Sequence, residues 1–234
     1  MVILALESSA PSASAAVIQD GRVLSLMYLN VGLTHSVTLL PLVKQACEGA
    51  GVSVRELDAV AVANGPGSFT GVRIGVATAK GIAQPSNIDC IPVSTLEAIA
   101  YPLADSDCIA AAVMDARCSQ VYSGFFDCEG GECRRIAEDK AITFDEFLEK
   151  INKSEKKVIL IGDGADIAFE YIKDKTDKAE KASPLIRFQN AASVGLIAEK
   201  KLKNNSNILK SNELVPSYLR LPQAERELKK KKES

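Results

Sequence analysis

Apolar and polar positions follow one another along the chain in blocks that predict strands and helices. Short apolar runs with the length of buried strands occur at residues 2–6, 58–63, 88–91, 109–114 and 158–161. Apolar residues at helical spacing predict helices over about 35–47, 70–83, 144–151, 165–172 and 191–202. Two further apolar segments, 13–18 and 22–29, flank Asp20-Gly21, which is typical of a two-residue hairpin turn. The pattern predicts a protein that mixes strands with covering helices.

The predicted elements come in the same order twice: three strands, a helix, a strand and a helix. Meandering strands followed by strands that alternate with helices indicate a mixed sheet covered by helices. We therefore expect an α/β protein of two lobes, residues 1–106 and 107–234, each with a mixed sheet of about five strands and flanking helices. This order resembles that of the actin-like ATPase (ASKHA) superfamily, a likeness of fold that carries no function by itself.

Composition limits the chemistry. The 234 residues include 28 Lys and Arg against 30 Asp and Glu, and a single histidine, His35. A net charge of −2 provides no general field for binding nucleic acid, so any such contact needs a local patch or a partner. One histidine rules out a two-histidine metal site within the chain. The lone His35 is expected at a helix start or an interface rather than in a cysteine–histidine nucleophile pair.

The cysteines are expected to be buried thiols. Their spacing contains no C-x-x-C pair and no zinc-like pattern, the six being Cys47, Cys90, Cys108, Cys118, Cys128 and Cys133. The N-terminus lacks a signal-peptide pattern, and no apolar run approaches the ~20 residues that span a bilayer. We therefore predict a cytoplasmic protein without disulfides or membrane contact.

A glycine-rich segment joins a predicted strand to a predicted helix at residues 64–71, Asn-Gly-Pro-Gly-Ser-Phe-Thr-Gly. It is neither a Walker A loop nor a G-x-G-x-x-G fingerprint, because the lysine and the last glycine are missing. Two interpretations stay open: a tight turn with Ser68 or Thr70 as the helix N-cap, or a backbone contact to phosphate.

The helix behind this segment has small residues every four positions, at Gly71, Gly75 and Ala79. Each interior glycine costs a helix about 0.8–1 kcal/mol relative to alanine, so a packing gain should offset it. Close approach of another helix would supply that gain. The second helix is either internal, with 35–47 as the natural companion, or on another subunit.

Several stretches together resemble the TsaB (YeaZ) family. The most specific are residues 65–75, Gly-Pro-Gly-Ser-Phe-Thr-Gly-Val-Arg-Ile-Gly, and residues 216–220, Pro-Ser-Tyr-Leu-Arg, with Ala-Glu-Arg at 224–226. His35-Ser36 followed by Leu-Leu-Pro at 39–41, and Met-Asp-Ala-Arg at 114–117 followed by Val-Tyr at 121–122, add weaker support. The resemblance spans nearly the whole chain.

The resemblance implies a role in making N6-threonylcarbamoyladenosine, the tRNA modification beside the anticodon. In that family the protein is a non-catalytic paralogue of TsaD, the metal-bearing transferase that the ATPase TsaE assists. It binds TsaD, or itself as a homodimer, through two helices that match about 36–47 and 70–83, and reaches tRNA only within the complex. The implied interface residues are His35, Ser36, Leu39, Leu40, Val43, Thr70, Gly71, Arg73, Ile74, Gly75 and Ala79.

Catalytic groups of the relatives are missing from the matching positions. Where TsaD has two metal-binding histidines four residues apart, this chain has Thr95 and Ile99, so no metal site of that kind is expected. The two loops that match the phosphate-binding hairpins of actin-like ATPases, 7–12 and 115–119, contain no glycine. We expect weak or absent ATPase activity and no intrinsic cofactor. Weak ADP or ATP binding at a subunit interface stays open, with Glu7, Ser8, Ser9 and Asp115 as the candidate residues.

Two other functions stay open as alternatives: an independent small-molecule kinase of the actin-like superfamily and a glycoprotease. The glycine-free loops disfavour the kinase, and the lack of metal ligands or a nucleophile–base pair disfavours the protease. Arg73 and Lys80 share one side of their helix, where they meet either solvent, a partner carboxylate or tRNA phosphate. The basic run 229–232 is expected to be a disordered tail.

Overall fold

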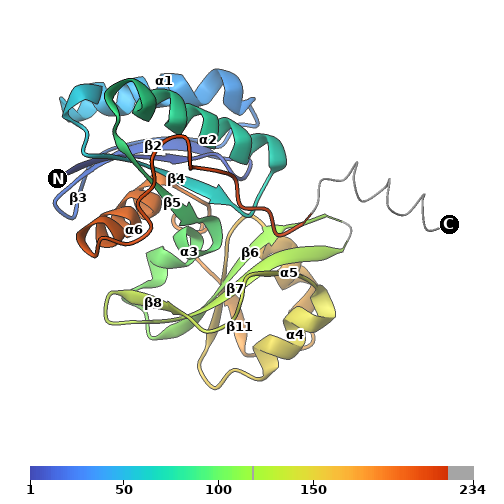
Figure 1. Cartoon of the computed structure of the whole chain (residues 1–234). Coiled ribbons are helices and arrows are strands. Elements are labelled where there is room, and N and C mark those ends of the chain that lie inside the picture. Colours follow the sequence, from blue (N-terminus) through green and yellow to red (C-terminus); the bar gives the residue numbers. More distant parts are fainter. Residues whose placement is uncertain (118, 221–234) are drawn as a thin grey trace.

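The computed structural model describes residues 1–117 and 119–220 and shows two lobes, each built on one sheet (Figure 1). The first sheet has five strands in the order β3-β2-β1-β4-β5. Their bounds are β1 Val2–Glu7, β2 Ala13–Gln19, β3 Arg22–Leu29, β4 Ala59–Gly65 and β5 Asp89–Ser94. β1 pairs antiparallel with β2 and parallel with β4, so the sheet is mixed, as predicted.

Helices cover both faces of the first sheet because the side chains of its strands alternate between two apolar cores. Leu4, Leu6 and neighbouring valines contact α1 (His35–Ala50) and α2 (Phe69–Ala83). Ile3 and Ala5 face the opposite way, toward α6 (Ala191–Lys203). The predicted hairpin is present: Asp20 and Gly21 have φ values of 49° and 78°, as a two-residue turn with two left-handed residues requires.

The second sheet has six strands in the order β11-β10-β6-β7-β8, with β9 pairing to β7. Their bounds are β6 Cys108–Asp115, β7 Gln120–Glu129, β8 Glu132–Arg135, β9 Lys140–Thr143, β10 Val158–Ile161 and β11 Ala179–Lys181. Helices α4 (Phe144–Asn152) and α5 (Ala165–Ile172) cover one face, and α3 (Thr95–Ala100) contacts the other. Single 3₁₀ turns lie at Val54–Glu56, Gln84–Ser86 and Tyr101–Leu103. The short strands β9 and β11 were not predicted.

The chain returns to the first lobe after completing the second. Helix α6 contacts β1, β2, β4 and β5 of the first sheet, although the sequence placed it in the second lobe. Residues 204–220 then run across the first lobe, where Leu214 is fully buried in the core with α2. The predicted boundary near residue 106 therefore separates the two sheets, but the assignment of all of 107–234 to one lobe is wrong. The predicted tail at 229–232 lies outside the described residues.

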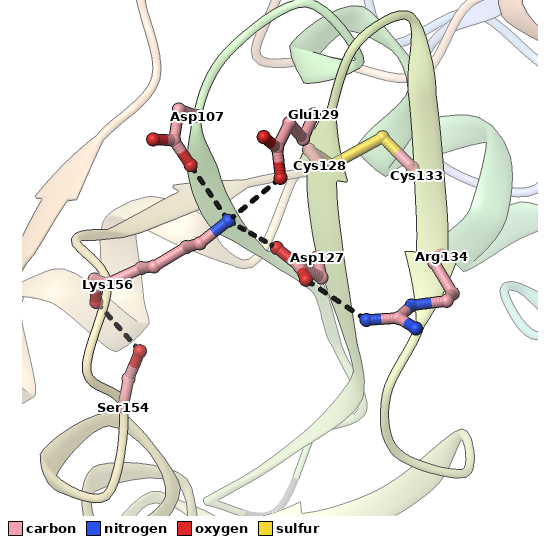
Figure 2. Close-up of polar contacts among 8 residues, drawn as sticks. All are labelled: Asp107, Asp127, Cys128, Glu129, Cys133, Arg134, Ser154 and Lys156. Atoms are coloured by element: carbon pink, nitrogen blue, oxygen red, sulfur yellow. Dashed lines mark hydrogen bonds and ion pairs between the residues drawn. A yellow bond between two sulfur atoms is a disulfide. The ribbon is translucent and has the colours of Figure 1, made fainter.

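The expectation that every cysteine is a thiol is also wrong. Cys128 and Cys133 form a disulfide across the hairpin of β7 and β8, which Figure 2 shows. The turn Glu129–Glu132 sets these two cysteines directly opposite each other, with their Cα atoms 4.2 Å apart. Spacing alone did not reveal this pairing, because it depends on the register of the hairpin. Three cysteines, Cys47, Cys90 and Cys108, are buried thiols as predicted, and Cys118 lies outside the described residues.

An ionic cluster supports the same hairpin (Figure 2). The Lys156 ammonium lies 2.8 Å from Asp107, 3.0 Å from Asp127 and 3.4 Å from Glu129. Hydrogen bonds to Asp107 and Asp127 raise the pKa of Lys156. The same contact lowers the pKa of Asp127. The cluster thereby links the start of β6 and the end of β7 to the loop before β10.

Within residues 1–117 and 119–220, no helix combines the length and the apolarity needed to cross a bilayer.

Candidate functional site

A cleft of about 580 Å³ lies where the ends of strands from both lobes meet. The loop after β1 forms one wall with Ser9, and the start of α2 forms another with Ser68 and Arg73. The second lobe contributes Asp115, the last residue of β6, and Asp163, which follows β10. Ligands of sheet proteins commonly bind at such carboxyl ends of strands, so this cleft is the candidate ligand site.

The glycine-rich segment acts as a tight turn packed on the loop after β1. Ser68 caps α2, because its Oγ accepts a hydrogen bond from the Gly71 amide at 3.3 Å. The Ser68 amide in turn donates to the Ser9 carbonyl at 2.7 Å. A side chain at Gly67 would collide with that carbonyl oxygen, so only glycine fits. The predicted turn is present, and Ser68 rather than Thr70 is the N-cap. The phosphate contact stays a prediction.

Two carboxyl groups near the cleft have raised pKa values: Glu7, which is buried outside the cleft lining, and Asp163, which lines the cleft. Glu7 is fully buried and accepts the Ser9 amide at 2.6 Å through one oxygen. Its other oxygen has no partner among the described residues. Burial raises the pKa of Glu7 to about 7. Burial also raises the pKa of Asp163 to about 6, even though Gln189 donates a hydrogen bond to it at 2.5 Å.

The four predicted nucleotide contacts do not share one surface. Ser8 is buried and donates its hydroxyl proton to the Gly71 carbonyl at 3.0 Å, facing α2 rather than the cleft. Glu7 is buried beside it, whereas Ser9 and Asp115 line the cleft. The Asp115 carboxylate accepts the Arg117 amide at 2.7 Å, which fixes the second loop. The structure thus brings two of the four predicted residues to the candidate ligand site.

The positions that match the metal ligands of TsaD lie in the core. Thr95 and Ile99 are buried on α3, between the two sheets. No cluster of three or more potential metal-ligating side chains occurs in the parts of the chain that the structure describes.

The small-residue stripe of α2 faces the inside of the chain. A side chain at Gly71 would collide with the carbonyl oxygen of Ser8, and one at Gly75 would lie 2.6 Å from the Ser8 Oγ. Ala79 is fully buried in the same core. The expectation that Gly71, Gly75 and Ala79 present themselves to a partner is therefore wrong. The stripe allows α2 to approach the first sheet and the loop after β1.

The predicted interface residues on helix α1 fall into two groups, one buried and one exposed. Leu39 and Val43 are core residues, with exposed fractions of 1% and 4%, so their placement in an interface is wrong. Ser36 is exposed, and the exposed fraction of Leu40 is 59%. Leucines with both orientations occur side by side because adjacent positions of a helix point about 100° apart.

Exposed apolar residues extend from Leu40 into the loop before α1. Val31, Leu33 and Val37 have exposed fractions of 65%, 58% and 66%. Together with Leu40 they form what we call the apolar face of α1. Val31, Leu33 and Val37 were not predicted as surface residues, although the sequence shows the first two directly before the helix start at His35 and the third in the first turn of the helix. Clustered exposed apolar residues of this kind indicate a protein interaction site.

The remaining predicted interface residues lie around the start of the two helices. Thr70 and Arg73 are exposed on α2, and Ile74 is half-buried. His35 begins α1, and its Nε2 hydrogen-bonds the Ala10 carbonyl at 2.7 Å, as expected for a residue at a helix start. These four residues remain candidates for a partner contact.

Comparison with known proteins identifies the family. A family model described as "TsaD: tRNA N6-adenosine threonylcarbamoyltransferase" matches residues 31–228. The tRNA threonylcarbamoyladenosine biosynthesis protein TsaB of Bacillus subtilis is 29% identical over 96% of this chain and 96% of its own length. The protein of the same name from Escherichia coli is 30% identical over 70% of this chain and 72% of its own length. The chain belongs to the TsaB (YeaZ) family.

A solved structure has the same fold. The structure of YeaZ from Pseudomonas aeruginosa superimposes with a TM-score of 0.77 at 24% identity, covering 93% of this chain and 99% of its own. That likeness concerns the fold. Together with the strand order of the two sheets, it confirms the α/β fold of two lobes, each with a mixed sheet, that was expected from the sequence.

Proposed function

We propose that this TsaB-family chain is a non-catalytic subunit of tRNA threonylcarbamoyladenosine biosynthesis that binds and activates a TsaD-type transferase. The apolar face of α1 is the observation that carries the proposal, because its four large apolar side chains are each more than half exposed to water and lie within ten positions of the chain. The names of the TsaB relatives supply the pathway. Covering this face with a partner stabilises the complex through the hydrophobic effect.

The absence of catalytic groups at the positions that match those of the relatives supports a role without catalysis. TsaD-type metal binding has no ligands at Thr95 and Ile99, and both phosphate-loop counterparts lack glycine. An independent kinase would need close backbone approach to phosphate in those loops. We therefore propose that ATP hydrolysis by the chain itself is weak or absent, and that any ADP or ATP bound at the cleft contacts Ser9, Asp115 and the start of α2.

Assembly follows from the same surface. In the absence of the transferase, two copies of the chain would cover their apolar faces against each other, which gives a homodimer that the transferase displaces. A TsaE-type ATPase and tRNA would then meet this chain only within the complex with the transferase.

A binding measurement tests the proposal. Titration calorimetry of the full chain with the TsaD-type transferase of the same organism should show saturable binding. Leu40→Asp should weaken it at least about tenfold, because an ionised carboxylate is costly to bury. Leu185→Asp is the matched control, since Leu185 is 95% exposed on the second lobe. No binding by the native chain, or equal binding by both variants, would contradict the proposal.

A further inference from the structure

Residues 204–220, which we call the C-terminal strap, tie the end of the chain to the first lobe. The strap leaves α6 and crosses the lobe toward the start of α2 (Figure 1). Leu209 and Cys90 exchange two backbone hydrogen bonds of 2.9 and 2.8 Å, which cover the free edge of β5. Leu214 is fully buried, and the Lys80 ammonium donates to its carbonyl at 3.1 Å. The strap is therefore part of the folded lobe.

Its next residues fit closely against the end of β4. The Ser217 amide donates to the Asn64 carbonyl at 2.7 Å. The Ser217 carbonyl oxygen occupies the space that a side chain on Gly65 would need. This contact fixes the backbone immediately before Tyr218, so the direction of the Tyr218 side chain is set by the lobe.

Tyr218 contacts two residues in the first turns of α2, Phe69 and Arg73. Its ring stacks on Phe69, with centroids 4.7 Å apart and planes 25° apart. Its hydroxyl accepts a hydrogen bond from Arg73 Nε at 2.7 Å. The Arg73 guanidinium also lies 5.6 Å from the Tyr218 ring centroid and 5.9 Å from that of Phe69, within the range of cation–π attraction. Arg73 is thus held by three contacts, two of which come from Tyr218.

The guanidinium retains most of its donors in this position. Arginine has five N–H groups, and Tyr218 engages one of them. The other four have no acceptor within residues 1–117 and 119–220. Tyr218 binds only the Nε–H group. The N–H groups on the two terminal nitrogens therefore remain available for a planar, bidentate contact with a carboxylate.

The strap also reaches the second lobe. Arg220 donates to the Ala116 carbonyl at 3.2 Å, and its guanidinium lies 5.8 Å from the Tyr122 ring centroid. Ala116 and Tyr122 both line the cleft between the lobes. The segment 217–220 therefore spans from α2 to the loop after β6 and fixes Tyr218 from both sides.

We infer that Tyr218 is a positioning residue of the partner surface: through its ring and hydroxyl it holds the Arg73 guanidinium ready for a carboxylate on the transferase. This inference rests on the proposed function for the identity of the partner. Holding a long side chain in its bound conformation before association removes part of the ordering cost of binding.

A double-mutant cycle of binding tests the role of the hydroxyl. Tyr218→Phe keeps the ring and removes the hydrogen bond, so it should raise the Kd for the transferase about three- to tenfold. Arg73→Ala should weaken binding further, and adding Tyr218→Phe to Arg73→Ala should then change nothing. Additive effects of the two substitutions, or native affinity of Tyr218→Phe, would overturn the inference.

Tyr171→Phe is the matched control. Tyr171 stacks on Phe144 at 5.0 Å and 24°, and its hydroxyl donates to Asp145 at 2.6 Å, all in the second lobe. Its substitution removes the same atoms from a similar stack and should leave the Kd unchanged.

A measurement on the isolated chain separates this inference from the proposed function. In ¹⁵N NMR spectra, the Nε–H of Arg73 should give a sharp signal protected from exchange with water, assigned by its absence in Arg73→Ala. Tyr218→Phe should broaden this signal or shift it to the position of exposed arginines. An unchanged signal in Tyr218→Phe would refute the positioning role even if the chain binds the transferase. A lost signal without binding by the native chain would refute only the proposed function.

Discussion

Gly75 and Ser8 show how tightly the first lobe is packed around the loop after β1. The Ser8 hydroxyl is directed at the backbone of α2 by its hydrogen bond to the Gly71 carbonyl. This places the Ser8 Oγ where a side chain on Gly75 would begin, with Val62 on the other side at 3.3 Å. The glycine is therefore required by an internal contact, although its spacing also suits a contact between helices of two subunits.

Gly75→Ala should lower the free energy of unfolding by about 1–2 kcal/mol, because overpacking outweighs the gain in helix propensity. Gly81→Ala in the same helix should raise it by about 0.5–1 kcal/mol, since no atom lies within 4 Å of the added Cβ. Urea denaturation of both variants measures the two changes. Equal effects at the two sites would show that Gly75 is not packed against Ser8.

Glu7 brings a carboxyl group into the interior without full compensation by hydrogen bonds. Its pKa is raised from 4.5 to about 7 by burial, against the lowering effect of the hydrogen bonds from Ser9. The folded chain therefore holds a proton at Glu7 that the unfolded chain has already released above pH 4.5. Protein stability should fall as the pH rises from about 4.5 to 7, and the loss is complete above that range.

Glu7→Gln should remove the part of this pH dependence that is due to Glu7, because the amide is neutral and still offers an oxygen to the Ser9 amide. The part due to the raised pKa of Asp163, which acts between about pH 3.8 and 6, should remain. At pH 8 the variant should be more stable than the native chain by up to roughly 3 kcal/mol. The measurement is the free energy of unfolding between pH 4 and 9. Glu155→Gln, at an exposed position, is the control and should follow the native curve. Parallel curves for Glu7→Gln and the native chain would contradict a buried, protonated Glu7.

Helix α1 has one side that packs in the core and one side that is exposed to solvent. One side of it completes the core of the first lobe, and the neighbouring side carries the apolar face of α1. The hydrophobicity of the side chains does not tell the two sides of the helix apart, because leucine occurs on both. Burial, rather than residue type, divides structural leucines from those available to a partner.

Leu39→Ala should therefore cost about 2–5 kcal/mol of unfolding free energy, as for a leucine buried in a core. Leu40→Ala should change it by no more than about 0.5 kcal/mol, because its side chain is already mostly in water. Thermal and urea unfolding of the two variants at low protein concentration provide the comparison. A large loss for Leu40→Ala would mean that this side of α1 is covered within the chain.

Much of this element structure was predictable from local patterns. The helix at 165–172 and the strands at 22–29 and 158–161 have the predicted bounds, because apolar periodicity and turn residues specify them locally. The strands β9 and β11, of four and three residues, are too short and too polar to give such a signal. The pairing of Cys128 with Cys133 and the inward direction of Gly75 depend on register and packing, which a single sequence does not display.

The candidate site was predicted in outline but not in its orientation. The motif at 65–75 correctly located the turn and the start of the helix, and the resemblance to TsaB correctly gave the family. Neither the motif nor the resemblance shows which residues of the two helices point outward, because both orientations of the helices are compatible with the same sequence. The strap contact between Tyr218 and Arg73 joins positions 145 residues apart, and only the folded chain brings them together.

At the scale of the molecule, the end of the chain holds the two lobes in one unit. Helix α6 covers the first sheet after the second lobe is complete, and residues 217–220 connect α2 with the loop after β6. The apolar face of α1, Arg73 and the cleft are thereby parts of one framework. A partner that covers α1 and the start of α2 would also contact the mouth of the cleft.

We propose above that this chain activates a transferase without performing the transfer. The most direct test is threonylcarbamoyl transfer from threonylcarbamoyl-adenylate to tRNA, with release of AMP, by the purified TsaD-type transferase and TsaE-type ATPase of the same organism, with and without this chain. We predict no transfer by the chain alone, full transfer only when all proteins are present, and a large loss with Leu40→Asp but not with Leu185→Asp. Transfer by the chain alone, or equal transfer in its absence, would contradict the account.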